Sequence, residues 1–150
     1  MEGFKGLNET CVIFNQLEKA IDYAMWINFS YRKQNVQPFY VISGPDNNYA
    51  VVSDDILDEH FPESVTHPLN ENYLKLSYEE IRELAKDRNP LKHWEELCGA
   101  FSTMDGELLR YILHMKIPLE KLIRYELAKR GYDESHHWCG FERADQIWLK

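Results

Sequence analysis

STMDGELLRYILHMKIPLEKLIRYELAKRG, residues 102–131, is the most strongly patterned stretch of the chain. Ser102 and Asp105 fit a helix start in which a hydroxyl caps free backbone N–H groups and an acid follows in the first turn. Apolar residues then recur at helical spacing on one face: Leu108, Leu109, Ile112, Leu113 and Met115. The pattern predicts a helix that ends before Pro118, because the residue before a proline is pushed out of the helical region.

The second half of this stretch predicts another helix, so that the two helices meet at a tight Ile117-Pro118 corner. Pro118 suits the first position of a helix, where its missing N–H costs nothing. The expected buried face is Leu119, Leu122, Ile123 and Leu127. Gly131 predicts the stop, because glycine readily adopts the left-handed turn that ends a helix.

Glu126 and Arg130 fall in the middle of that apolar face. They are four residues apart, in the order that favours an ion pair. A semi-buried pair would be either an ion pair at a docking surface or, as we favour, a salt bridge where the helix leaves the core. An exposed pair beside Lys121 and Arg124 would mean that this helix faces a partner, and it would rank the helix above the acids of residues 43–74 as the functional surface.

The length and composition of the chain indicate a folded protein of one domain or two small subdomains. The 150 residues are 44% hydrophobic and 13% aromatic, which argues against disorder. No apolar run approaches the ~20 residues of a membrane helix, and the start, MEGFKGLNET, lacks the features of a signal peptide. The three cysteines are odd in number and show no paired spacing. We therefore expect a cytoplasmic protein that meets no membrane.

The formal net charge is −8, which disfavours an extended nucleic-acid surface. The charge is unevenly spread. Residues 43–74 hold seven acids and no lysine or arginine, whereas residues 107–130 hold six basic groups against three acids. The sequence predicts one acidic side and one locally basic side.

The first part of the chain predicts a small antiparallel sheet with one helix. Residues 10–14 are β-branched and aromatic, as in a strand, and residues 16–33 show helical periodicity. Two further strands, 38–44 and 48–53, flank the turn Pro45-Asp46-Asn47. Apolar residues on both faces of the hairpin indicate a sheet covered on both sides, and we expect the later helices to be the second cover.

The later part predicts helices. Residues 54–61, DDILDEHF, suggest one or two helical turns capped by Ser53, and a connecting loop is expected at 61–76. Ser77-x-x-Glu80 is a capping box, and Asn89-Pro90 is a cap followed by a first-position proline. A last helix is expected at about 141–149.

The predicted fold class is therefore α+β. An N-terminal β-α-β-β unit, residues 1–60, is expected to pack on a C-terminal bundle of four to five helices, residues 77–150, in one compact protein.

Two leads to metal or acid–base chemistry are thin. His136, His137 and Cys139 lack the two spaced ligand pairs of a zinc site and are better explained as a polar loop that caps the last helix. The acids at 54–59 lie near His60 and His67, but among polar residues where solvent keeps their pKa values ordinary. The chain also lacks GxSxG and GxGxxG. We predict no catalytic residue, metal or cofactor.

The leading functional hypothesis is a non-enzymatic acidic protein that binds and blocks a basic protein partner. The partner could be a nuclease or a nucleic-acid-binding protein, and the chain an inhibitor or immunity factor of a bacterial or phage system. Trp26 and Phe29 project from the back of the 16–33 helix, where either the C-terminal helices cover Trp26, which we favour, or the two aromatic residues form an interaction patch that anchors such an interface. The predicted partner-binding residues are Asp54, Asp55, Asp58, Glu59, Glu63, Trp26 and Phe29.

The alternative hypothesis is a DNA-binding regulator. The helix pair at 104–130 resembles a helix-turn-helix in outline, with basic residues on and before its second helix. These residues are Lys116, Lys121, Arg124 and Lys129. The corner lacks the usual glycine, and Ile112 stands where close helix crossing favours a small residue.

Overall fold

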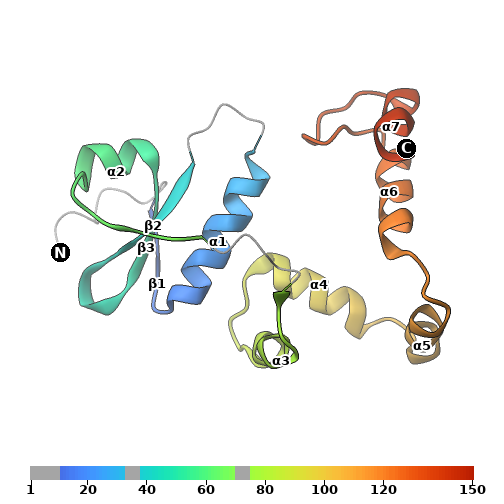
Figure 1. Cartoon of the computed structure of the whole chain (residues 1–150), viewed down its shortest axis with the longest axis horizontal. Coiled ribbons are helices and arrows are strands. Elements are labelled where there is room, and N and C mark those ends of the chain that lie inside the picture. The colour runs from blue at the N-terminus through green and yellow to red at the C-terminus, as the bar shows by residue number, and fades with distance from the viewer. Residues whose placement is uncertain (1–10, 33–37, 70–74) are drawn as a thin grey trace. The chain divides into compact units, whose positions relative to one another are not determined.

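The computed structural model describes residues 11–32, 38–69 and 75–150 (Figure 1). It confirms the α+β class, with a small antiparallel sheet followed by helices. Contacts divide the chain into two compact units, Met1–Glu95 and Glu96–Lys150. The first unit therefore extends past the connecting loop expected at 61–76 and includes residues 77–95, which the sequence analysis assigns to the helical part. Within the described residues, no helix is long and apolar enough to cross a membrane.

The sheet has four strands in the order β1-β3-β2-β4, and every neighbouring pair is antiparallel. The three predicted strands are present as β1 (Cys11–Phe14), β2 (Phe39–Ser43) and β3 (Tyr49–Ser53). The fourth, β4 (Thr66–His67), lies within the predicted loop and pairs with β2. Two residues are too few to give an alternating pattern, so the sequence could not predict this strand.

A short 3₁₀ turn, η2 (Pro45–Asn47), joins β2 to β3. Asp46 and Asn47 have φ angles of 56° and 59°. Aspartate and asparagine tolerate this left-handed conformation better than most residues. The backbone N–H of Gly44 donates to the carbonyl of Asn48 at 2.7 Å and closes the turn. The predicted hairpin is confirmed.

Helix α1 (Leu17–Ser30) covers one face of the sheet. Its buried residues Ala20 and Ala24 lie against Val41 and Val51. Asn28, a polar residue on the predicted apolar face, uses its amide oxygen to accept the N–H of Phe39 at 2.7 Å and its amide nitrogen to donate to the carbonyl of Phe39 at 3.1 Å. The side chain thus fixes the start of β2.

Helix α2 (Asp54–His60) covers the opposite face (Figure 1). Its residues Ile56 and Leu57, with Phe61, pack against Ile42, Ala50 and Val52. Our prediction that later helices form the second cover is therefore wrong. Because α2 begins directly after β3, it lies close enough to pack against residues of that strand. Ser53 occupies the predicted N-cap position, but its side chain makes no capping hydrogen bond.

The remaining helices are α3 (Tyr78–Lys86), α4 (Lys92–Ser102), α5 (Gly106–Met115), α6 (Leu119–Lys129) and α7 (Phe141–Trp148). The capping box at Ser77 and Glu80 is confirmed, with both reciprocal hydrogen bonds present. Helix α4 begins two residues after Pro90, so Asn89-Pro90 is not its cap and first turn.

The corner between α5 and α6 forms in a different way from the prediction. Asp105, not Ser102, caps α5, because α4 extends through Ser102, whose hydroxyl donates back to the carbonyl of Gly99 at 3.1 Å. Lys116 ends α5 in the left-handed conformation. Pro118 is the N-cap of α6, one residue earlier than predicted. Gly131, with φ 71°, follows α6 as expected.

Candidate functional site

The predicted acidic residues lie on and after α2. Asp55, Asp58, Glu59 and Glu63 are exposed, and Asp54 is half-buried. Asp54 lies beside Tyr40, and the pKa of that phenol is raised by partial burial and then by the Asp54 and Asp58 carboxylates. The described part of the chain places no lysine or arginine within ion-pair distance of these acids; only the imidazole of His60 comes near, 3.8 Å from Glu59. They form an exposed acidic surface without enclosing walls.

The two predicted aromatic anchors lie on α1, across the sheet from α2. Trp26 is 42% exposed; its ring stacks on His93 at a centroid distance of 4.8 Å and on Phe29 at 6.1 Å. Phe29 in turn lies under the guanidinium of Arg32, 4.0 Å from the ring centroid. The structure therefore does not bring the aromatic pair and the α2 acids together into one site.

The histidines singled out in the sequence do not converge with carboxylates in a pocket. His60 is exposed at the end of α2, and His67 accepts or donates a hydrogen bond with Ser43 at the edge of the sheet. His136 is exposed and stacks on Tyr132. The described ranges contain no group of three or more histidine, cysteine, aspartate or glutamate side chains placed to hold a metal ion.

The Glu126–Arg130 pair is exposed. The side chains are 51% and 61% accessible, and their closest atoms are 3.2 Å apart. Hydrogen bonding by Arg130 lowers the pKa of Glu126. Exposure of this pair is the outcome that the sequence analysis takes to favour α6 over the acids of residues 43–74 as a candidate interaction surface. The other predicted cations are partly engaged, because Arg124 pairs with Glu120 at 2.9 Å and Lys129 with Glu126 at 3.6 Å.

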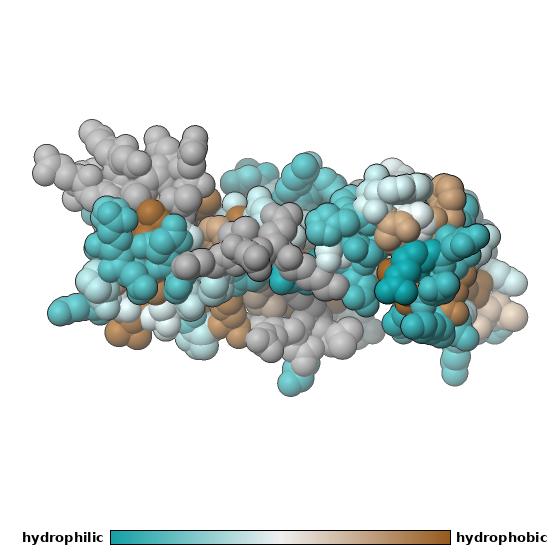
Figure 2. Space-filling model, turned by 90° about the horizontal axis from the view of Figure 1, so that it is seen from above, coloured by the Kyte–Doolittle hydropathy of each residue, from teal (hydrophilic) through white to brown (hydrophobic). Residues whose placement is uncertain are grey.

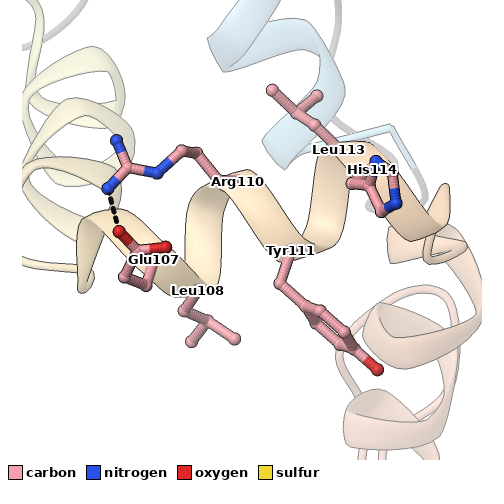
Figure 3. Close-up of a pocket in the computed structure, with 6 residues that line it drawn as sticks. All are labelled: Glu107, Leu108, Arg110, Tyr111, Leu113 and His114. Carbon is pink, nitrogen blue, oxygen red and sulfur yellow. Dashed lines mark hydrogen bonds and ion pairs between the residues drawn. The ribbon is translucent and has the colours of Figure 1, made fainter.

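Helix α5 carries a shallow depression whose lining residues all come from this one helix. Figure 3 shows Leu108, Tyr111, Leu113 and His114 projecting from α5, with Arg110 turned back to an ion pair with Glu107. A depression without a second wall cannot enclose a ligand. We regard it as part of an exposed helix surface.

The first unit contains a better formed site, a groove of about 720 Å³ beside α1, α3 and the start of α4. This volume is within the usual range for binding sites, ~300–1,000 Å³. Its apolar lining residues are Ile21, Met25, Leu76, Leu84, Leu91 and Trp94. Its charged lining residues are Glu18, Asp22, Glu79, Glu80, Glu83 and Asp87, against Lys19 and Lys86. We call this the acidic groove.

Polar contacts hold the start of α4 against α1 at the acidic groove. The carboxylate of Asp22 accepts the indole N–H of Trp94 at 2.8 Å and lies 3.1 Å from Nε2 of His93. Lys19 donates to the carboxylate of Asp87 at 2.7 Å and to the carbonyl of Asn89 at 2.6 Å. These bonds connect residues about seventy positions apart in the sequence.

The acids of α3 are held in different ways. The Ser77 backbone N–H and hydroxyl bond the Glu80 carboxylate and lower its pKa. Glu83 lies 3.5 Å from Lys86 in an exposed pair. Glu79, in the first turn, adds negative charge at the positive end of the helix. The groove therefore combines half-buried apolar side chains, which we call its floor, with charged side chains that are mostly negative and mostly exposed, which we call its rim.

No family model, curated protein or solved structure matches the chain.

Sequence reasoning missed this groove, because its acids lie on segments that read individually as ordinary solvated helix faces. A signal was present in α3, where Glu79, Glu80 and Glu83 stand beside the apolar Leu84. Nothing local to that segment indicates that α1 and Trp94 supply the opposite wall.

Proposed function

We propose that the chain is a non-enzymatic binding protein whose acidic groove takes a basic, amphipathic segment of a protein partner. One observation carries the proposal: six acidic side chains and two basic ones surround an apolar floor in a volume of about 720 Å³. A purely electrostatic surface would not need the floor, and an apolar pocket for a neutral ligand would not need the acids.

The two parts of the groove have separate roles in binding. The negative rim attracts and orients a positive partner before contact, which mainly raises the association rate. The apolar floor, which includes Leu84, Leu91 and Trp94, supplies affinity by burying the partner's apolar side chains. Amphipathic helices dock into grooves of this type with apolar anchors at helical spacing.

The same chemistry suits an inhibitor or immunity factor that covers the basic surface of a nuclease or nucleic-acid-binding protein. A cytoplasmic location and a bacterial or phage origin belong to this proposal. The exposed acids of α2, which include Asp55 and Asp58, remain the other proposed surface for a basic partner, on the far side of the sheet from α1.

The two acidic surfaces can be compared with one probe, a fluorescently labelled amphipathic helix built of leucine and lysine. A peptide with glutamate in place of lysine is the control for charge. The groove variant is Glu79→Gln with Glu83→Gln, and the matched variant is Asp55→Asn with Asp58→Asn. Each variant removes two negative charges, one of them in the first turn of a helix.

We expect the groove variant to weaken peptide binding about 2- to 30-fold, since two rim ion pairs contribute ~0.2–1 kcal/mol each. The Asp55/Asp58 variant should bind nearly as well as the unaltered chain. Equal losses in both variants would mean general attraction and no specific groove. A loss in the Asp55/Asp58 variant alone would move the site to α2. No binding of the lysine peptide to the unaltered chain would refute the proposal.

DNA binding by the α5–α6 pair stays the second candidate, favoured by the exposed side chains of Lys116 and Lys121. The ion pairs of Arg124 and Lys129 with glutamates of their own helix reduce the positive charge offered to phosphates. The exposed apolar residues of the same helix also suit a protein better than a duplex.

A further inference from the structure

Helix α6 presents an apolar face to solvent. Leu122 is 53% exposed and Ile123 is 59% exposed, and Leu119 lies beside them at helical spacing. Another side of the helix packs on α7, where Ala128 and Ala144 are buried. The space-filling view in Figure 2 shows hydrophobic residues, in brown, reaching the surface between hydrophilic ones. Large apolar side chains that lie exposed together on one helix face suit an interaction surface.

The second unit buries few of its own side chains, so burial of apolar surface within it contributes little stability. Its buried residues are Ala128, Gly131 and Ala144, so no large apolar side chain of residues 96–150 is fully buried. Large apolar residues at helical spacing stabilise a protein only when another surface covers them. The apolar face of α6 therefore fits a docking role.

The charges around this face complement the acidic groove. Lys129 and Arg130 follow Leu122 and Ile123 by seven residues and so lie on the same side of the helix. Both pair with Glu126 on that side, so the two cations and one acid leave one net positive charge there. Helix α6 with its C-cap, residues 119–130, holds four basic groups and two acids, whereas the acidic groove holds six acids and two basic groups. One chain thus carries a basic amphipathic helix and a groove of the chemistry that binds one.

We propose that α6 of one copy docks in the acidic groove of a second copy, and that the reciprocal contact closes a two-fold dimer. The proposal rests on the proposed function, because it names the segment that fills the same groove. Two such contacts per pair use both surfaces of each chain and leave neither open for further growth. An external basic partner must then compete with α6, so dimer formation limits access to the groove.

A charge-swap pair of full-length variants tests this arrangement. The first variant reverses the groove, with Glu79→Lys and Glu83→Lys. The second reverses the helix, with Lys129→Glu and Arg130→Glu. In each variant alone, every groove would face an α6 of like charge. In an equal mixture, the unaltered α6 of the first meets the unaltered groove of the second, and the two reversed surfaces meet each other.

Sedimentation velocity should show a dimer for the unaltered chain, monomers for each variant alone, and a dimer again for the mixture. Circular dichroism of each variant establishes that it is folded, and Leu113→Glu on α5 serves as a control for a charge placed on another exposed apolar residue. An unaltered chain that sediments as a monomer, or a mixture that stays monomeric, would overturn the dimer. Retained binding of the leucine–lysine peptide in that case would leave the proposed function intact.

Discussion

Gly131 should be the least replaceable glycine among those that the structure describes. Its φ angle of 71° is one that residues with a Cβ adopt at a cost of ~1–2 kcal/mol. A Cβ at this position would also meet the ring of Trp138, with Cη2 only 2.8 Å away. Overpacking of this kind typically costs ~1–3 kcal/mol. Gly131→Ala should therefore destabilise the protein by about 2–5 kcal/mol, the sum of the two ranges.

The assay is urea unfolding followed by circular dichroism, together with hydrogen exchange of the α6 and α7 amides. Gly99→Ala is the matched control, because Gly99 lies inside α4 and its added Cβ would meet nothing within 4 Å. That substitution should stabilise the chain by ~0.5–1 kcal/mol, since alanine favours helix more than glycine does.

A double-mutant cycle with Trp138→Ala separates the two costs at Gly131. Without the indole, only the cost of the positive φ, ~1–2 kcal/mol, should remain. The reasoning fails if Gly131→Ala changes the unfolding free energy by less than ~0.5 kcal/mol, the usual effect of a neutral surface substitution. An equal cost with and without Trp138 would refute the steric part.

Two further predictions concern the charges. Hydrogen bonding from Lys19, and then from the Asn89 N–H, lowers the pKa of Asp87. Because the pKa of Asp87 is lower in the folded chain than in the unfolded chain, these bonds stabilise the fold fully when the pH is above the unfolded-state pKa. The stabilisation disappears as the pH falls through the folded-state pKa. Asp87→Asn should therefore lower the urea midpoint at pH 7, and the midpoints of the variant and the unaltered chain should approach each other below about pH 4. A difference between the two midpoints that does not change with pH would contradict this prediction. If α6 binds DNA instead of protein, a gel shift at low salt should disappear with Lys121→Ala plus Arg124→Ala, and the absence of any shift for the unaltered chain would remove this alternative.

Local pattern predicted the elements of this fold well. The apolar runs of β2 and β3, the turn residues Asp46 and Asn47, and the capping box at Ser77 each depend on neighbours in sequence. Errors arose where two local signals competed. Ser102 and Asp105 are both acceptable helix caps, and the outcome depended on how far α4 continued.

The candidate site was less predictable, because its parts meet only through tertiary contacts. The bonds of Asp22 to Trp94 and of Lys19 to Asp87 join segments about seventy residues apart, and no periodicity in either segment encodes that meeting. The α2 acids, in contrast, are visible in the sequence as a run of one charge, whereas the acids of the groove are dispersed over α1, α3 and Asp87.

Ala20 and Ala24 occupy fully buried positions between α1 and the sheet, where their methyl groups pack in one cluster with Val41 and Val51. Close-packed interiors respond to a single added methylene group. In an evolving lineage these two positions should change more slowly than the acids of the groove rim. The sheet unit would then keep its architecture while the binding surface diverged to follow a changing partner.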